Sequence, residues 1–235
     1  MINKFKHNAA MCFLWFSAIL FCLPLFGQNL NPGLSDNDKL SLVTRLVSRI
    51  IAKNHYRQHP LDKKISSQIF DDFFKRLDEN KTFFTSEDIE SFEPYRLLLA
   101  DMIEQGNFEF PLKVYELFLG RFREYRDYSE KMLGEDFDFS KDEEFIIDRR
   151  KMPRAKDMAE LREERAQQEV HDENLKKDEN AIALPVKSPE DKIKRRLRDI
   201  YNVLSQRNRF DILAEFLSCV SQTYGPHSSY FSPRE

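Results

Sequence analysis

The sequence predicts an all-α protein, a multi-helix domain with a long polar helix and short irregular connections. Apolar side chains recur at the 3.6-residue spacing of an amphipathic helix in five segments of the chain. Only six glycines occur among 235 residues, whereas turn-dense β folds and phosphate-binding loops use more glycine. The length allows one or two domains, and any strand is expected to be confined to a short piece.

The first 27 residues predict a targeting segment. Lys4 and Lys6 form a basic start, and an uncharged apolar run follows from Ala9 to Phe26. This is the arrangement of a secretory signal peptide, with cleavage expected near Gly27. The run is also marginally long enough to span a membrane, so an uncleaved anchor in the inner membrane is the alternative. We therefore expect an exported protein of the periplasm or cell envelope, with residues 28–35 as a linker.

The helical domain is expected to span residues 36–223 and to begin with two helices. Ser35 and Asp36 can cap a helix that runs to about Tyr56, and a second helix covers about Asp62 to Leu77. The apolar residues that follow at helical spacing in the first helix are Leu40, Val43, Leu46, Val47, Ile50 and Ile51. Those expected on one face of the second are Ile65, Ile69, Phe70, Phe73 and Leu77.

The stretch L-D-E-N-K-T-F-F-T-S-E-D-I, residues 77–89, predicts a polar turn, an apolar plug and a short helix. The turn comprises Asp78 to Lys81. Thr85 or Ser86 then caps the short helix, whose acidic first turn suits the helix dipole. The phenylalanines expected to share one core are Phe70, Phe73, Phe83 and Phe84.

Two further helices are expected in the middle of the chain. Pro94 interrupts the helical pattern, which resumes from Tyr95 to Gln105 and is closed by Gly106. Pro111 suits the first turn of a longer helix that ends near Leu133. The basic residues along this longer helix are expected to form a solvated face.

The region from Lys141 to Glu179 is dense in charge. Within it, residues Glu143–Arg150 predict either a short strand or a helical turn. Residues Asp157–Leu175 predict a polar helix that either projects from the body or covers another part of it. Residues Lys176–Lys187 are expected to form a loop.

Two helices complete the predicted domain. The combination of Ser188, Pro189 and two acidic residues predicts a helix that runs to about Gln206. A last helix spans Phe210 to Tyr224, and residues 224–235 are expected to be a linker. The inward positions of the first of these helices are Ile193, Leu197, Ile200, Tyr201 and Leu204. Those of the last helix are Leu213, Phe216, Leu217 and Val220.

No catalytic, cofactor-binding or metal-binding residue is predicted. His55 and His59 have the i, i+4 spacing of helical metal ligands, but no third ligand lies nearby in sequence, so a structural role is favoured. No serine has a lysine three residues later, and no G-x-S-x-G is present. Ser228 and Ser229 adjoin His227, but neighbours in an extended loop point in opposite directions, which argues against a catalytic pair.

Cysteine content and charge limit the partners. Without residues 1–27 the chain retains only Cys219, which cannot form an internal disulfide and is expected to be a small core residue. The formal net charge is −3, and it becomes −5 without residues 1–27, which carry Lys4 and Lys6 and no acidic residue. This gives no support for binding nucleic acid. No cofactor is expected, and a membrane is expected to meet the chain only through an uncleaved N-terminal segment.

Several motifs follow one another in a distinctive order. They are H-Y-R at residues 55–57, I-S-S-Q-I-F-D-D-F at 65–73, L-D-E-N-K-T-F-F-T-S-E-D-I at 77–89, D-R-R at 148–150 and Y-G-P-H-S-S-Y-F-S-P at 224–233. From about Asp36 to residue 235 the chain therefore resembles the N-terminal region of the tail-specific proteases, also called carboxy-terminal processing peptidases. The motifs at 77–89 and 224–233, read in this order, are the most specific.

The resemblance implies a function that the residues alone do not. In that family a D-P-H-[TS]-x-Y-[FL]-[ST]-P stretch follows the helical domain and leads into a PDZ domain and a protease domain with a serine–lysine dyad. Gly225 stands where the family has Asp, which implies a looser loop. The PDZ and dyad residues have no counterpart here, so no catalytic residue is carried over.

Two hypotheses follow from the resemblance. The first is a non-catalytic helical module of an exported serine endopeptidase, truncated or split, inactive alone, with protein or peptide substrates and a PDZ/protease chain as partners. The second is a free-standing envelope protein-binding domain that acts as a scaffold or adaptor without protease activity.

Overall fold

The computed structural model describes residues 33–56, 59–132, 149–165 and 189–231, and every regular element within these ranges is a helix. The predicted all-α fold is confirmed. The expected targeting segment, residues 1–27, lies outside the described residues.

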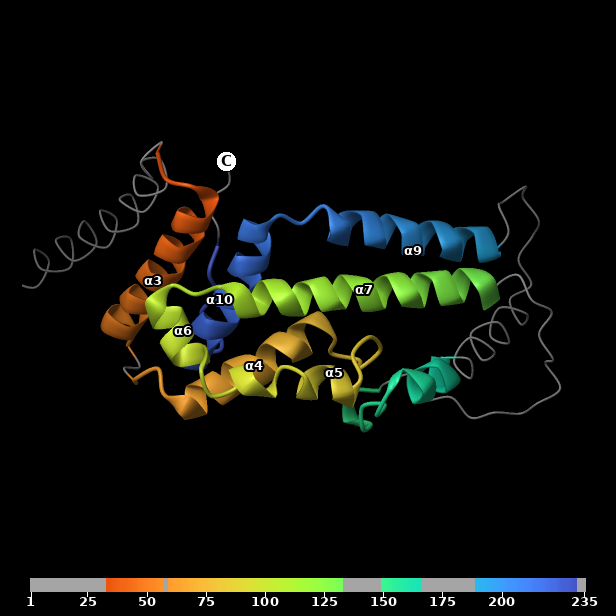
Figure 1. Cartoon of the computed structure of the whole chain (residues 1–235), viewed down its shortest axis with the longest axis horizontal. Helices are drawn as coiled ribbons and strands as arrows, with labels where there is room; N and C mark the ends of the chain where they lie inside the picture. Colours follow the sequence, from red (N-terminus) through yellow and green to blue (C-terminus); the bar gives the residue numbers. More distant parts are fainter. Residues whose placement is uncertain (1–32, 57–58, 133–148, 166–188, 232–235) are drawn as a thin grey trace, which may run out of the picture.

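One long helix organises the molecule. Figure 1 shows α7 (Glu109–Met132) along the longest axis, with α9 (Pro189–Ser205) on one side and α4 (Lys63–Leu77) and α5 (Ser86–Glu90) on the other. Three further helices gather at one end: α3 (Asp36–Asn54), α6 (Leu99–Gln105) and α10 (Arg209–Tyr224).

The helix starts predicted near Ser35, Asp62 and Thr85 are present as side-chain caps, and the cap predicted at Ser188 lies outside the described residues. Ser35 and Asp38 form a capping box at α3, in which each side chain accepts a hydrogen bond from the backbone N–H of the other residue. Asp62 caps α4 without a capping box, and its side chain accepts a hydrogen bond from the Ile65 N–H. Thr85, rather than its neighbour, caps α5 and forms a second capping box with Asp88. Such caps satisfy backbone donors that a helix leaves free at its first turn.

The apolar residues of α3 are divided between a buried and an exposed face. Leu40 is buried, and Val43 and Val47 pack against the core. However, Leu46 is 40% exposed and Ile50 is 54% exposed, so the apolar positions at helical spacing in α3 do not all face the core. The reason is that α3 lies at the edge of the molecule and packs on α6 and α10 through one face only.

The helix predicted from Tyr95 begins later. Residues 93–95 form a 3-10 helix, and α6 starts at Leu99, where the Ser66 hydroxyl accepts a hydrogen bond of 2.8 Å from the Ala100 N–H. Gly106 ends α6 as predicted, with a left-handed φ of 77°. A Cβ at this position would also lie 2.5 Å from the Ser41 hydroxyl, so both conformation and space favour glycine.

The phenylalanine core is confirmed. Phe70, Phe73 and Phe84 are fully buried in one cluster, and Phe83 is partly buried against it. Phe110, from the first turn of α7, and Phe216, from α10, complete the centre, with ring centroids 5.9 Å and 5.3 Å from that of Phe73. Aromatic contacts therefore join α4, α7 and α10 in one core, and the burial of these rings stabilises the fold.

The last two helices are buried to different extents. The inward positions predicted for α10, Leu213, Phe216, Leu217 and Val220, are all buried. The stripe predicted for α9 is only partly buried: Tyr201 and Leu204 pack against the core, but Ile200 is 38% exposed, so the assignment of Ile200 to the core is wrong. The difference arises because α10 contacts α3, α4 and α7, whereas α9 packs chiefly on α7.

The charge-dense region is described only in part. Residues Arg149–Lys151 form a 3-10 helix, and residues 143–148 of the predicted strand or turn lie outside the described residues. Within the predicted polar helix, residues 158–165 are helical, and residues 166–175 again lie outside. None of the helices in the described ranges combines the length and the apolar character needed to cross a bilayer.

Candidate functional site

The first polar cluster is centred on Asp78, in residues 77–89, which we call the Asp78 loop. The side chain of Asp78 is 1% exposed. Its carboxylate accepts hydrogen bonds from the backbone N–H groups of Thr82, Phe83 and Phe84 at 2.7, 3.1 and 3.0 Å. The predicted polar turn therefore exists, with Lys81 at a positive φ of 56°. A buried carboxylate bonded in this way fixes the path of the chain into the phenylalanine plug.

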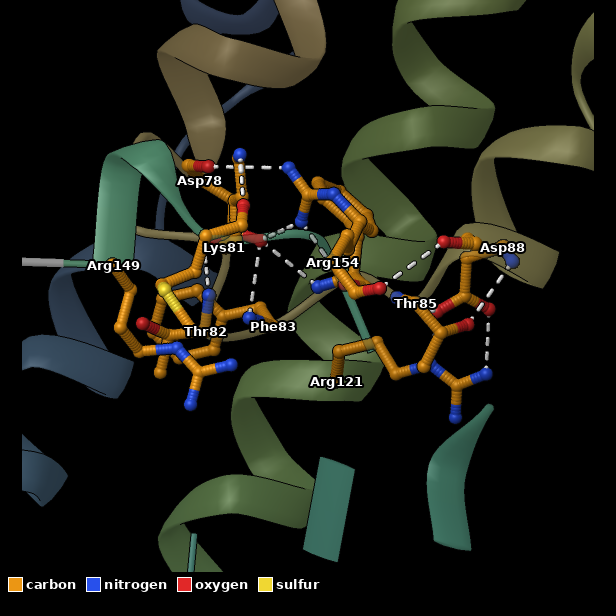
Figure 2. Close-up of polar contacts among 12 residues, drawn as sticks. Asp78, Lys81, Thr82, Phe83, Thr85, Asp88, Arg121, Arg149 and Arg154 are labelled. Atoms are coloured by element: carbon orange, nitrogen blue, oxygen red, sulfur yellow. Dashed lines mark hydrogen bonds and ion pairs between the residues drawn. The ribbon is translucent and has the colours of Figure 1, made fainter. Parts of the chain in front are cut away.

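A second segment of the chain lies on this loop. Arg154 forms an ion pair with Asp78 and donates a hydrogen bond of 3.0 Å to the carbonyl oxygen of Phe84 (Figure 2). The carbonyls of the next two residues, Ala155 and Lys156, accept from the N–H groups of Ser86 and Glu87. Because a buried charge requires a partner, Arg154 links residues 149–165 to the Asp78 loop.

A second carboxylate of the loop, that of Asp88, also has donors on both of its oxygens. Asp88 accepts from the Thr85 N–H at 3.0 Å and from Arg121 of α7 at 2.9 Å and 2.6 Å (Figure 2). Both oxygens of Asp78 and of Asp88 therefore face donors of the protein itself. These carboxylates hold neighbouring segments of the chain together. Neither has an oxygen that is free to accept a proton from a substrate.

The second polar cluster surrounds residues 225–231, which we call the exit loop. This loop turns back along α10, because the Ser218 hydroxyl donates to the carbonyl oxygen of Tyr230 at 3.0 Å and accepts from its N–H at 3.3 Å. Tyr230 packs against the core, whereas Phe231 is 85% exposed. The predicted linker thus begins as an ordered segment.

Both histidines singled out in the sequence contact this region. The His55 Nε2 atom lies 3.0 Å from the Ser228 hydroxyl. The His59 ring stacks on Tyr224 with centroids 4.0 Å apart, and its Nε2 atom lies 3.2 Å from the carbonyl oxygen of Thr223. Both residues follow the end of α3 at Asn54, so their i, i+4 spacing is not a helical one, and their rings lie against the end of α10 and the exit loop. Within the described ranges, no group of three or more His, Cys, Asp or Glu residues is arranged to hold a metal ion.

The sequence did not predict the contact between Ser228 and His55. His227 and Ser229 are exposed, and Ser228 is bonded to a histidine 173 positions away. A serine hydroxyl at this distance from an imidazole has the geometry of a nucleophile and its base. However, the Ser228 N–H donates to the Gly225 carbonyl at 2.9 Å, so this N–H is not free to stabilise an oxyanion. The contacts fix the exit loop against α3.

Gly225 provides the space for this contact. Its φ of −173° is extended and suits any residue. A Cβ at this position would lie 3.3 Å from both His55 Cε1 and the Ser228 hydroxyl, closer than a comfortable packing distance. The His55–Ser228 contact thus occupies the space that a side chain at position 225 would need. The family that the chain resembles has Asp at this position.

Cys219 has the role predicted for it. It is fully buried in the core cluster of α10. Burial raises the pKa of its thiol to about 11, because a thiolate is disfavoured in apolar surroundings. The thiol therefore stays protonated at neutral pH and is unreactive.

Comparisons with known proteins agree on one family. Residues 47–234 match the family described as "Tail specific protease N-terminal domain". The whole chain is also similar to a tail-specific protease of Haemophilus influenzae, with 28% identity over 250 residues. The alignment covers 100% of this chain and 34% of that relative, so the chain spans about a third of the relative's length.

Proposed function

The chain belongs to the family of tail-specific protease N-terminal domains, and from this we propose that it is the non-catalytic helical module of an exported tail-specific serine endopeptidase. The peptide-bond chemistry would be performed by a PDZ/protease chain, and the helical module would engage the same protein or peptide substrates.

The observation that carries this proposal is the ordered exit loop. In the resembling family the equivalent stretch leads from the helical domain into the PDZ domain. Here the stretch contacts α3 through His55 and Ser228 and contacts α10 through Ser218 and Tyr230. A connection held on two helices would give the following domain a defined orientation, and such orientation is what a positioning module supplies.

A peptidase assay tests the non-catalytic part of the proposal. The purified chain is incubated with an unstructured polypeptide that ends in apolar residues, and the products are followed by mass spectrometry. We expect no cleavage, because the sequence contains no S-x-x-K motif and the Ser228 N–H is bonded within the exit loop. Cleavage that disappears in the double variant Ser228→Ala, Ser229→Ala would overturn the proposal.

Export is tested by the N-terminus of the native protein. The basic start and the apolar run of residues 9–26 support secretion. We expect the mass of a chain that begins near residue 28 in the periplasmic fraction. An intact Met1 in the membrane fraction would support the anchored alternative instead.

The DNA sequence after codon 235 distinguishes the two hypotheses about the whole protein. A PDZ and protease sequence, in frame or after a frameshift, would support the protease module. An unrelated gene would support the scaffold or adaptor.

A further inference from the structure

We propose that a hollow between α3 and α6 binds a short basic peptide through its free amino and carboxyl ends. The two helices pack against each other at one end of the molecule (Figure 1). The hollow has a volume of about 440 Å³, within the range of about 300–1,000 Å³ that is typical of small-ligand sites. Its polar walls are formed by Ser48 and Arg49 of α3 and by Asp101, Glu104 and Gln105 of α6. The inference does not rest on the proposed function.

The charged residues of the hollow do not pair with one another. Arg49 lies on one wall, and Asp101 and Glu104 lie on the other, and all three are exposed. None of them forms an ion pair or a side-chain hydrogen bond with the parts of the chain that the structure describes. By comparison, Arg96 and Arg121 each hold two carboxylates. The charges of the hollow are therefore available to a ligand.

The positions of these charges define the chemistry of the ligand. Arg49 suits a carboxylate, because a guanidinium can donate two parallel hydrogen bonds to its oxygens. Asp101 and Glu104 suit ammonium groups, which donate only. One guanidinium against two carboxylates leaves the hollow with an excess of one negative charge. A free peptide with one lysine matches this set, since it carries two ammonium groups and one carboxylate.

The remaining lining suits the body of a peptide. Ser48 is 2% exposed, and its hydroxyl donates to the carbonyl oxygen of Arg45 at 3.0 Å, so its lone pairs can still accept from a ligand N–H. The amide of Gln105 can both donate and accept. Ala52 and Leu61, both half-buried, add apolar surface. A peptide unit, which has one donor and one acceptor, finds partners for both here.

A peptide matches the two walls better than a single amino acid. The axes of packed helices lie about 8–10 Å apart, and Arg49 does not reach either carboxylate of α6. An α-amino acid holds its ammonium and carboxylate groups on one carbon atom. Each further residue of an extended chain adds about 3.3–3.6 Å between the two ends. A dipeptide can therefore contact both walls with its two termini.

The surroundings of Glu104 strengthen its attraction for a cation. Burial and, after it, the charge of Glu104 raise the pKa of Tyr224. The Tyr224 side chain is fully buried, and its hydroxyl has no hydrogen-bond partner. The field of Glu104 therefore reaches the interior of the protein, where solvent ions screen charges less than on an open surface. An ammonium group at Glu104 gains correspondingly more.

A titration followed by NMR tests the proposal. The purified full chain, labelled with ¹⁵N, is titrated at low ionic strength with lysyl-alanine. Two further ligands are compared with it: lysyl-alanine amide, which lacks the carboxylate, and free lysine, which lacks the peptide unit. The variants are Arg49→Gln and Glu104→Gln, and the matched control is Arg195→Gln at an exposed position of α9. Circular dichroism shows whether each variant remains folded.

We expect saturable shifts of the amide signals of Ser48, Ala52 and Gln105. Arg49→Gln and Glu104→Gln should each weaken the binding of lysyl-alanine about fivefold, the upper range for one ion pair at an exposed position. Lysyl-alanine amide should bind the wild type about fivefold more weakly than lysyl-alanine. Arg49→Gln should not weaken the binding of the amide further, because the same contact is already absent. Arg195→Gln should bind as the wild type does.

Several results would overturn the proposal. The first is an absence of saturable shifts at the hollow. The second is equal binding of lysyl-alanine and its amide, because Arg49 would then hold no carboxylate. The third is binding of free lysine as tight as that of lysyl-alanine, since no peptide unit would then be recognised. The fourth is an equal loss in Arg195→Gln and Arg49→Gln, which would show only a general effect of charge.

Discussion

The Asp78 loop and the exit loop both contact distant parts of the chain through polar groups, but they do so with different chemistry. The Asp78 loop uses a carboxylate with 1% exposure, three backbone donors and the guanidinium of Arg154. In the exit loop, the Ser228 hydroxyl contacts the imidazole of His55, and the backbone of Tyr230 contacts the Ser218 hydroxyl of α10.

This difference in chemistry should make the Asp78 loop the more rigidly held of the two regions and the exit loop the more adjustable. Removal of one partner of a buried ion pair leaves an unpaired charge in apolar surroundings and costs about 3–5 kcal/mol. A single hydrogen bond between neutral groups contributes about 1 kcal/mol. Substitutions in the Asp78 loop should therefore destabilise the whole domain, whereas substitutions in the exit loop should change mainly the position of that loop.

The largest effect is expected from the aromatic core below the Asp78 loop. Phe84→Ala and Phe73→Ala should each lower the free energy of unfolding by about 3–5 kcal/mol, because both residues are fully buried. Thermal and urea denaturation of the purified chain measure this. If both variants kept the thermal midpoint of the wild type, the described packing would be incorrect.

The next effect tests the buried pair itself. Arg154→Ala should lower the free energy of unfolding by about 3 kcal/mol, since Asp78 keeps its backbone donors but loses its cation. The matched control is Arg150→Ala, because Arg150 is 56% exposed and lies 3.9 Å from the equally exposed Glu79. Equal stability of the two variants in urea denaturation would contradict the distinction between the two loops.

A smaller effect is expected in the exit loop. Ser228→Ala should lower the free energy of unfolding by about 1 kcal/mol, the usual contribution of one hydrogen bond. A double-mutant cycle with His55→Ala isolates the contact, and a coupling energy of about 0.5–1.5 kcal/mol is expected. A coupling energy near zero would show that the two side chains do not interact in solution. Ser229→Ala, at an exposed neighbour, serves as the control.

The smallest effect concerns a charged contact on α10, the helix along which the exit loop lies. Burial would raise the pKa of Glu215, but hydrogen bonds from Arg76 and Arg207, at 2.9 Å each, outweigh it and hold that pKa below its usual value. A lowered pKa stabilises the fold above the unfolded value, near 4.3, and this stabilisation is lost as the pH falls through the folded value.

Urea denaturation between pH 7 and pH 3 compares the wild type with Glu215→Gln. The stability difference between the two proteins should shrink below about pH 4. A difference that stayed constant over this range would argue against the charged contact.

Local features of the fold could be read from the sequence, and long-range ones could not. The caps at Ser35 and Thr85 and the end at Gly106 follow from residues within one turn, so their patterns predict them. The buried phenylalanines were also predictable, because their size leaves them few other places. By contrast, the Asp78–Arg154 and His55–Ser228 contacts join residues 76 and 173 positions apart, and no local pattern records them.

The helix faces show a second limit. In α3 the apolar positions extend around more of the helix than the core covers, and periodicity alone gave no reason to place Leu46 outside and Val47 inside. The deciding fact was that α3 lies at the edge of the molecule, with neighbours on one face.

The return of the exit loop along α10 determines how the domain would respond to a mechanical load. Tension applied at residue 231 acts first on the Ser218–Tyr230 contact, then on the turn at Ser228, and only afterwards on α10 itself. The force therefore acts on one hydrogen bond at a time, and hydrogen bonds that break one after another need less force than bonds that must break together. The exit loop would therefore lengthen under tension before the phenylalanine core is loaded, and it would act as a compliant element in series with a stiff domain.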